Sequence, residues 1–167
     1  MLFYYIVILM GILIDQLSKL MVLSFLKPVG SIAIIPSIFH LTYTENDGAA
    51  FSMLAGHQFF LILITLIFIL IIFYFFLRLP KNRRYFELNF SFAMILSGAI
   101  SNLLDRIFRN FVVDFIDLRI IGFAIFNVAD MLVVFGCLLL IYQLFLNKEL
   151  LNDDNDVFSL PGKKSQK

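Results

Sequence analysis

Several features of soluble and metal-binding proteins are missing from this sequence of 167 residues. It has no tryptophan and a single cysteine, Cys137, so an internal disulfide is excluded and a metal site would need other ligands. The two histidines, His40 and His57, have no partner at the spacing of a metal site, and neither a metal nor an organic cofactor is expected. Charged residues make up 15% of the chain and the net charge is +1, which argues against a nucleic-acid partner.

Apolar side chains dominate instead. Hydrophobic residues account for 61% of the sequence, phenylalanine occurs 21 times and the mean hydropathy is +0.95. A soluble domain is nearer half apolar, so the composition predicts an integral membrane protein in contact with membrane lipid. The sequence is apolar from Leu2 without a preceding basic stretch, which favours an uncleaved first membrane span over a removable signal peptide.

About 20 consecutive apolar residues are needed to cross the hydrocarbon core of a bilayer. Four stretches meet this requirement: Leu2–Leu26, Phe59–Leu77, Tyr85–Leu104 and Phe123–Leu146. The expected fold class is therefore an all-α integral membrane protein with four transmembrane helices. We expect residues 1–146 to form a single membrane-embedded domain, and the polar, aperiodic residues 147–167 to be a disordered cytoplasmic tail.

The charges of the loops predict the orientation. The second loop, Arg78–Arg84, carries four basic residues and no acidic one, and the positive-inside rule places it in the cytoplasm. Both termini are then cytoplasmic, and the first and third loops lie outside. The third loop, about residues 105–122, opposes this orientation mildly, because it also contains three arginines.

The first outer loop, about residues 27–58, is expected to hold a small extracytoplasmic β element. It contains two short runs of β-favouring residues, Ile32–Ile35 and Phe39–Thr44, and a strong turn signal, Asn46-Asp47-Gly48. This pattern predicts a hairpin or a small sheet. The third loop contributes a short apolar segment, Phe111–Ile116, that leads back toward the last span.

Polar side chains interrupt the apolar spans, and the predicted topology places them at one level near the outer surface. A charged side chain within a bilayer costs a few kcal/mol or more, so such residues usually mark a site. At 1.5 Å per residue, Asp15 lies roughly 20 Å along the first span, in its outer half. The other polar groups lie at the outer ends of spans or in the outer loops: Lys19, Asn46, Asn102, Asp105, Arg106, Asp114, Asn127 and Asp130.

Asp114 and Asp130 are candidates for a pair of catalytic carboxylates. Two carboxylates a few Å apart share one proton, so the ionised one can take a proton from water while the protonated one polarises a carbonyl. Such a pair hydrolyses an amide without a covalent intermediate. Two alternatives remain open: Asp114 as a solvated loop acid, and Asn127 with Asp130 as the cap of the last helix.

The other polar residues also allow a purely structural interpretation. Asp15 and Lys19 are four residues apart, so they can form an ion pair on one face of a helix. Asp105-Arg106 can be an ion pair or an anchor at the membrane interface. A serine–lysine pair, made of Lys19 with Ser97 or Ser101 on the third span, is a further alternative for the chemistry.

In their order along the chain, the polar clusters resemble the motifs of the lipoprotein signal peptidases, the bacterial type II signal peptidase family. The resemblance runs from Asp15 to Asp130 and omits only the tail. The matching segments are Asp15-Gln16-Leu17-Ser18-Lys19, Asn46-Asp47-Gly48-Ala49-Ala50-Phe51, Ser97-Gly98-Ala99-Ile100-Ser101-Asn102-Leu103-Leu104-Asp105-Arg106, Val112-Val113-Asp114-Phe115 and Phe126-Asn127-Val128-Ala129-Asp130. The chain departs from the family at Ser97 and Ser101, where glycine is usual.

This resemblance implies an intramembrane aspartyl endopeptidase of the bacterial cytoplasmic membrane, with Asp114 and Asp130 as its catalytic dyad near the outer face. Its substrates would be prolipoproteins, cleaved just before a diacylglyceryl-modified cysteine, and we expect a monomer without a cofactor. The loop Ser31–Gly56 would form an extracytoplasmic cradle. The resemblance gives a pocket or substrate-contacting role to Asp15, Lys19, Asn46, Gly48, Asn102, Asp105, Arg106, Asn127 and Ala129.

Two other functions compete with this hypothesis. A small proton-coupled membrane carrier would use Asp15, Lys19 and Asp130 as a relay, and its ionisable groups would be spread across the depth of the membrane. A non-catalytic lipid-binding scaffold would keep its function when Asp114 or Asp130 is replaced by Asn.

Overall fold

The structure is a computed structural model that describes residues 1–48 and 56–146. The expected tail, residues 147–167, and residues 49–55 of the first loop lie outside the described residues. The helices are α1 (Leu2–Met21), α2 (Gln58–Arg78), α3 (Phe86–Arg109) and α4 (Val128–Leu146). The strands are β1 (Ser31–Ile35), β2 (Phe39–Asn46) and β3 (Val112–Leu118). Short helical turns occupy Val22–Leu26, Arg83–Tyr85 and Arg119–Ile121.

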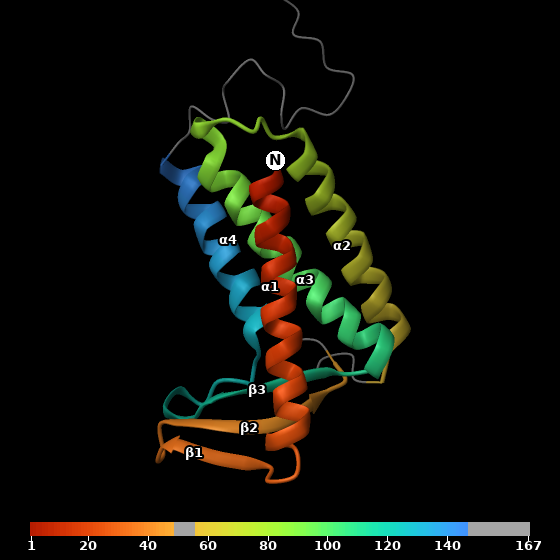
Figure 1. Ribbon diagram of the computed structural model, residues 1–167, viewed down its shortest axis with the longest axis vertical. Coiled ribbons are helices and arrows are strands. Elements are labelled where there is room, and N and C mark those ends of the chain that lie inside the picture. The colour runs from red at the N-terminus through yellow and green to blue at the C-terminus, as the bar shows by residue number, and fades with distance from the viewer. Residues whose placement is uncertain (49–55, 147–167) are drawn as a thin grey trace, which may run out of the picture.

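The four helices lie side by side, and the strands form a sheet at one end of the bundle (Figure 1). The N-terminus, the connection between α2 and α3 and the end of α4 lie at the opposite end (Figure 1). All four helices are long and apolar enough to cross a membrane. The predicted helical membrane protein with four spans and a small β element is therefore confirmed.

Two helices differ in extent from the predicted spans. α3 continues to Arg109, beyond the expected end at Leu104, because the polar side chains of its last turns have partners inside the protein. α4 begins at Val128 rather than at Phe123, because the preceding chain is extended and Phe126 forms a β-bridge to β3. Hydropathy alone reports neither of these tertiary contacts.

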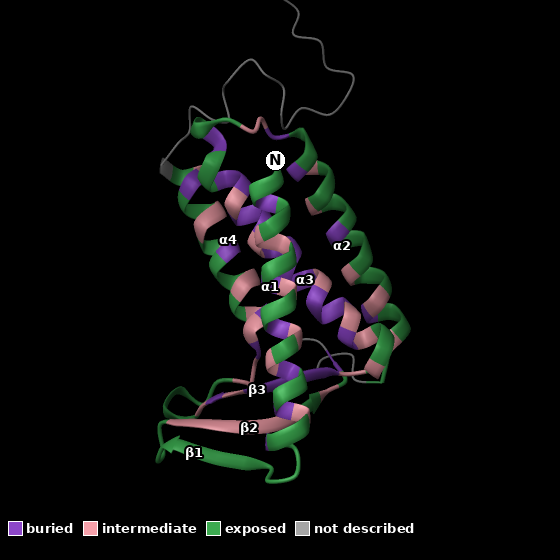
Figure 2. Cartoon of the chain, viewed as in Figure 1, coloured by how far each residue is buried: buried purple, intermediate pink, exposed green. Residues whose placement is uncertain are grey.

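α3 is the central helix of the bundle. In the most apolar stretch of α3, 67% of the residues are buried inside the protein, whereas the corresponding share in the other three helices is 17% to 22% (Figure 2). α3 contacts α1, α2 and α4, and its buried apolar side chains include Leu88, Phe92 and Leu96. Because its neighbours shield it from lipid, α3 can carry polar side chains at membrane depth.

α3 and α4 come into backbone contact at Gly98. A Cβ atom on this residue would lie 2.2 Å from the carbonyl oxygen of Ala129, in the first turn of α4. The absence of a side chain at Gly98 therefore lets α4 begin directly beside α3. Asn102 lies one turn further along the same face of α3, next to the start of α4.

The sheet has the strand order β1-β2-β3, and both pairings are antiparallel. β1 and β2 form the hairpin predicted from the first outer loop. β3 is the short segment of the third loop, whose pairing the sequence did not indicate. In the register of β2 and β3, Thr44 lies opposite Asp114 and Asn46 lies opposite Val112. This pairing places Asp114 beside the end of β2.

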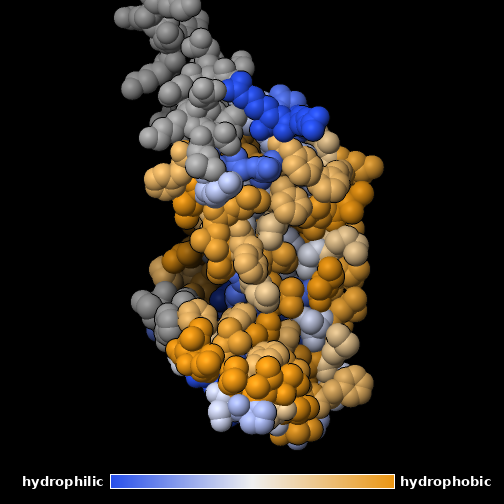
Figure 3. Space-filling view, turned by 90° about the vertical axis from the view of Figure 1, so that its left-hand side faces the viewer, coloured by the Kyte–Doolittle hydropathy of each residue, from blue (hydrophilic) through white to orange (hydrophobic). Residues whose placement is uncertain are grey.

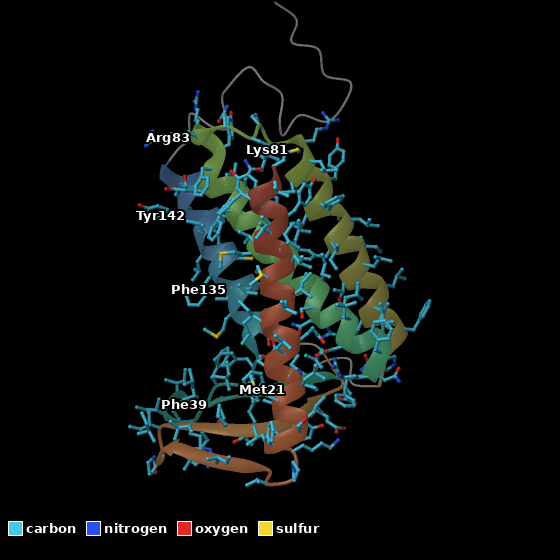
Figure 4. All side chains as sticks on the ribbon, in the orientation of Figure 1. Met21, Phe39, Lys81, Arg83, Phe135 and Tyr142 are labelled. Carbon is cyan, nitrogen blue, oxygen red and sulfur yellow. The ribbon has the colours of Figure 1, made fainter. Side chains whose placement is uncertain are left out.

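Basic residues gather at the end of the bundle away from the sheet, where Figure 4 labels Lys81 and Arg83. The Lys81 ammonium donates to the carbonyl of Phe76 and to Oδ1 of Asn89, and thereby joins α2 to α3. It also lies 4.0 Å from the centre of the Phe76 ring. Burial lowers the pKa of Lys81 to about 8.

Candidate active site

Helix α4 begins with a reciprocal cap that orients Asp130. Oδ1 of Asn127 accepts the backbone N–H of Asp130 at 2.9 Å, and Oδ2 of Asp130 accepts the backbone N–H of Asn127 at 3.1 Å. This is the geometry of a capping box, in which the first and fourth residues satisfy each other's free donors. The helix-cap role considered for this pair is thus present, and it points one Asp130 oxygen away from the helix.

The side chain of Asn127 also binds the second candidate carboxylate. Its Nδ2 donates to Oδ1 of Asp114 at 2.6 Å, while Nδ2 of Asn46 donates to the other Asp114 oxygen at 2.9 Å. One residue, Asn127, therefore contacts both Asp114 and Asp130. The two aspartates are sixteen positions apart, and they come together because β3 and the start of α4 meet at this asparagine.

Asp114 is not a solvated loop acid, because only 2% of its surface is exposed. Burial, together with the nearby charge of Asp130, raises the pKa of the Asp114 carboxyl to about 7, although the amide hydrogen bonds from Asn46 and Asn127 oppose the rise. A carboxyl with this pKa is close to half protonated at neutral pH. The pair can therefore hold one proton between its two members.

Asn102 of α3 connects Asp130 to a buried cluster of charges. Its Nδ2 donates to Oδ1 of Asp130 at 2.8 Å. Its Oδ1 accepts from the Lys19 ammonium at 2.8 Å and from Nδ2 of Asn127 at 3.3 Å. Both ends of the amide are occupied, so the hydrogen bonds determine its orientation.

The charged cluster is centred on Lys19, which lies 2.7 Å from Oδ2 of Asp15 and 2.8 Å from Oδ2 of Asp105. All three side chains are fully buried. Arg109 also pairs with Asp105, so two acids face two bases and the charges balance. Charges at this depth require such pairing, because an isolated one would lose its hydration without compensation.

The two acids of the cluster each hold the backbone next to a candidate catalytic residue. Oδ1 of Asp15 accepts the N–H of Ala129, the residue before Asp130, at 2.8 Å. Oδ2 of Asp105 accepts the N–H of Val113, the residue before Asp114, at 3.2 Å. Lys19 bridges the two acids, so one ion cluster positions both segments that carry the candidate carboxylates.

Arg106 contacts the loop after β2 instead of its neighbour Asp105. Its guanidinium donates to the carbonyl of Gly48 at 3.1 Å, and the N–H of Gly48 donates to Oδ1 of Asn46 at 3.0 Å. These bonds hold the Asn46 side chain with its Nδ2 toward Asp114. Arg106 and Gly48 therefore act on the site through Asn46.

Gln16 and Arg109 were not singled out from the sequence, and Ser101 was considered only as a partner of Lys19 in a serine–lysine pair. Ser101 donates to Oδ2 of Asp15 at 2.7 Å, Gln16 donates to Oδ1 of Asp105 at 3.0 Å, and Arg109 donates to Oε1 of Gln16 at 3.1 Å. Arg109 lies one turn after Asp105, a spacing that could have identified this pair. The partners of Gln16 and Ser101 lie on other helices and leave no such signal.

The serine–lysine alternative finds no support in these contacts. The Ser101 hydroxyl donates to Asp15, and the Ser97 hydroxyl donates to the carbonyl of Ile8 at 3.1 Å. Lys19 is instead held by carboxylates and by Asn102. Within residues 1–48 and 56–146, no group of three or more His, Cys, Asp or Glu side chains is arranged to hold a metal ion.

We expect Ser101→Ala to destabilise the protein by about 1–3 kcal/mol, the usual cost of removing a hydrogen bond to a buried charged group. The Asp15 carboxylate would lose its serine donor and Gln16 one of its acceptors. Unfolding in detergent micelles would measure the change. Ser91→Ala is the matched control, because Ser91 is equally buried but donates to the Leu88 carbonyl of its own helix. Equal effects of the two replacements would contradict the role given to Ser101.

Seen from the side of α4, the surface has a hollow with hydrophilic atoms in it (Figure 3). The hollow lies between the apolar side of the bundle and an apolar area at the sheet end (Figure 3). Asp130 is half-buried, whereas Asp114 lies deeper. The hydrophilic atoms of the hollow are thus bordered by apolar surface (Figure 3).

Known proteins resemble this chain over most of its length. The family model described as signal peptidase (SPase) II matches residues 7–146. A lipoprotein signal peptidase from Caldanaerobacter subterraneus subsp. tengcongensis is 44% identical over 131 residues, which are 78% of this chain and 88% of that protein. One from Halothermothrix orenii is 43% identical over 148 residues, 87% of this chain and 97% of that protein.

A solved structure of a bacterial membrane enzyme superposes with a TM-score of 0.77 at 28% identity, covering 98% of this chain and 94% of that chain. A second bacterial membrane enzyme gives 0.75 at 31% identity, covering 86% and 93%. The fold, the order of the motifs and the extent of these matches lead to one conclusion: this chain belongs to the signal peptidase II family.

Proposed function

We propose that this protein is an intramembrane aspartyl endopeptidase that removes the signal peptides of prolipoproteins by cleaving before a diacylglyceryl-modified cysteine. The observation that carries the proposal is the contact of one residue, Asn127, with both Asp114 and Asp130. Relatives named lipoprotein signal peptidase support the choice of substrate. All of these residues come from one chain, which is consistent with a catalytic monomer.

In the proposed reaction the two carboxylates share one proton. The ionised carboxylate takes a proton from water as the water oxygen bonds to the scissile carbonyl carbon, and the protonated carboxyl gives its proton to the carbonyl oxygen. The C–N bond of the tetrahedral intermediate then breaks, and a proton passes to the leaving amine. The raised pKa of Asp114 supports a pair that retains one proton near neutral pH. No metal ion or organic cofactor is required.

The remaining predicted site residues have two proposed roles. Three amide side chains would hold the carboxylates by donating hydrogen bonds to them and would also contact the substrate. They are those of Asn46, Asn102 and Asn127. The ion cluster would position the dyad through the backbone, and the loop after β2 would position Asn46. The members of these supporting groups are Asp15, Lys19, Asp105, Ala129, Gly48 and Arg106.

We also propose that the dyad faces the outside of the bacterial cytoplasmic membrane and that both termini are cytoplasmic. The basic connection Arg78–Arg84 and the N-terminus lie at one end of the bundle, and the sheet lies at the other (Figure 1). The positive-inside rule assigns the basic end to the cytoplasm. Residues 1–146 would then act as a single membrane-embedded domain.

The proposal is tested with purified protein in lipid vesicles and two forms of one prolipoprotein, with and without the diacylglyceryl group on its cysteine. We expect cleavage of the lipidated form, with the new N-terminus at the modified cysteine as read by mass spectrometry. Folded protein that cuts neither form would favour the carrier or the scaffold. A carrier would in addition acidify or alkalise the vesicle lumen when a solute gradient is applied.

The cleavage rate is expected to fall as pH rises above about 7. The pKa of Asp114 is raised to about 7, because the carboxyl is buried and faces Asp130. Above this pH the pair loses its shared proton, and no carboxyl remains to protonate the carbonyl oxygen. Measurement of kcat/KM from about pH 5 to pH 9 tests the direction. A rate that keeps rising through this range would argue against a dyad that works with one proton.

A further inference from the structure

The sheet extends sideways past the start of helix α4 (Figure 1). Its far end, made of the β1–β2 turn and the connection after β3, projects past α4 (Figure 1). Figure 4 labels Phe39 at this end, and labels Phe135 and Tyr142 on α4 toward the same side of the molecule. Phe135 and Tyr142 are 53% and 56% exposed on a helix with the composition of a membrane span, so the medium beside them is lipid. The projecting end therefore lies on the same side of the molecule as the lipid-facing side chains of α4.

The two faces of the sheet differ in polarity. Residues opposite each other on neighbouring strands share a face, and successive residues of a strand alternate between faces. The face that carries Asp114 is directed toward the start of α4, because Asp114 binds Asn127 there. Further out, this face bears the opposed pairs Ile32–Leu41, Leu41–Ile116 and Phe39–Leu118. The outer part of the face toward the helices is therefore apolar, whereas its inner part carries Asp114.

The opposite face carries a polar ladder. The hydroxyls of Ser31 and Thr42 lie 2.8 Å apart, and Thr42 donates to Oδ2 of Asp117 at 2.8 Å. Arg119 donates to the same carboxylate oxygen at 2.8 Å, and its side chain is 45% exposed. Nearer the helices the same face is covered, because Val113 and Phe115 pack against Val22 and Leu26. Only the far part of the sheet thus has one apolar and one polar face, an arrangement suited to a boundary between lipid and water.

The far end of the sheet carries a concentration of exposed apolar side chains. The β1–β2 turn contains Pro36, followed by Ser37 in the left-handed region at φ 64°, and the N–H of Ile120 donates to the carbonyl of Ile38 at 3.4 Å. The turn and the connection after β3 thus lie side by side. Together with the end of β1 they expose the residues that we call the apolar tip: Ile34, Ile35, Ile38, Ile120, Ile121 and Phe123.

Figure 3 looks at this side of the molecule and shows an apolar area at the sheet end, below the hollow. A contiguous group of six large apolar side chains would be unusual in contact with water. Transfer of each from water into an apolar medium is favourable in proportion to its exposed area. Continuity with the lipid-facing side of α4 identifies that medium as the same bilayer.

We propose that the apolar tip is immersed in the lipid leaflet at the sheet end of the bundle, so that the sheet is held against the membrane by its own side chains. The partner is the lipid surface of the bilayer that the four helices cross. Arg119, on the polar face, stays partly exposed and pairs with Asp117. The hollow between the sheet and α4 would then open to the lipid of the leaflet and not to the water outside the membrane (Figure 3). This inference is independent of the proposed proteolysis.

The absence of tryptophan makes a direct test possible, because a single introduced tryptophan is the only indole in the full-length protein. Ile38→Trp and Ile121→Trp probe the two halves of the tip. Each variant is placed in phosphatidylcholine–phosphatidylglycerol vesicles, and its fluorescence is quenched either by lipids brominated in the acyl chain near the headgroup or by aqueous iodide. Leu70→Trp, at a residue 58% exposed on α2, serves as the lipid control. Glu45→Trp, at an exposed position of β2, serves as the water control.

We expect both tip variants to be quenched by brominated lipid to a degree close to Leu70→Trp, to resist iodide, and to emit at shorter wavelength than Glu45→Trp. Quenching of both by iodide but not by lipid would overturn the proposal. Protection from both quenchers would also overturn it, since the tip would then be covered by protein, such as a second copy of the chain. Adding Ile120→Asp and Ile121→Asp to Ile38→Trp should abolish the lipid quenching, and unchanged quenching would show that the tip does not hold the sheet. Circular dichroism and gel filtration in detergent establish that each variant is folded.

Discussion

Asp114→Asn and Asp130→Asn are each expected to lower the rate of prolipoprotein cleavage by about 10²–10⁴-fold while the protein remains folded. Either replacement leaves a pair that cannot both take a proton from water and hold one for the carbonyl oxygen. Asn has the size of Asp and keeps one oxygen, so the side chain introduced by Asp130→Asn can still accept the Asn127 N–H of the capping box. The measurement is single-turnover cleavage in vesicles, with folding checked by circular dichroism.

Asp117→Asn is the matched control for these two variants. Asp117 lies on β3 with Asp114 but on the opposite face of the sheet, where Thr42 and Arg119 bind it. Its replacement should leave turnover close to that of the wild type. If Asp114→Asn or Asp130→Asn retains near-normal turnover, that aspartate is structural and the proposed mechanism is wrong. If Asp117→Asn is as impaired as Asp114→Asn, the loss reflects damage to the sheet.

Lys19→Met is expected to produce the largest loss of stability, about 3–5 kcal/mol, which is the usual cost of leaving buried charges without their partner. Asp15 and Asp105 would face each other in the bundle with only Arg109 to compensate. Activity should fall as well, because these acids hold the backbone N–H groups of Ala129 and Val113 beside the dyad. Unfolding in mixed micelles measures the first effect and cleavage the second.

Lys27→Met provides the comparison at the surface. Lys27 pairs with Glu45 at 2.9 Å, but both side chains are nearly half exposed, so solvent screens this ion pair and it should contribute little to stability. A triple variant, Asp15→Asn, Asp105→Asn and Lys19→Met, removes all three charges and should recover part of the stability lost in Lys19→Met alone. A loss for Lys19→Met no larger than that for Lys27→Met would mean that the buried ions are not coupled as their distances indicate.

Much of the fold follows from local sequence. Each membrane span is a predominantly apolar stretch, and hydropathy is a property of the stretch itself, so all four helices could be predicted. The hairpin of β1 and β2 was predicted for the same reason, because β-favouring runs and turn residues are local signals. Loop charges likewise suggest which end of the bundle is cytoplasmic.

The pairing of distant segments could not be predicted in this way. β3 is a short apolar run that only becomes a strand by pairing with β2. Helix α4 begins at Val128, later than predicted, because Phe126 forms a β-bridge with Ile116. This is a contact between two segments of one long loop. Such contacts depend on surfaces that are formed only after the helices have packed.

For the candidate site, too, local sequence signals indicated some features and contacts between distant segments determined the others. The sequence by itself made Asp114, Asp130 and Lys19 candidates, because charged residues in or next to apolar spans are costly and recognisable. Only the tertiary structure decided that Asn127 contacts both aspartates and that Asp15 and Asp105 hold the residues before them. Hydrogen bonds form between atoms a few Å apart, and only the packing of α1, α3, β3 and the start of α4 brings these atoms together.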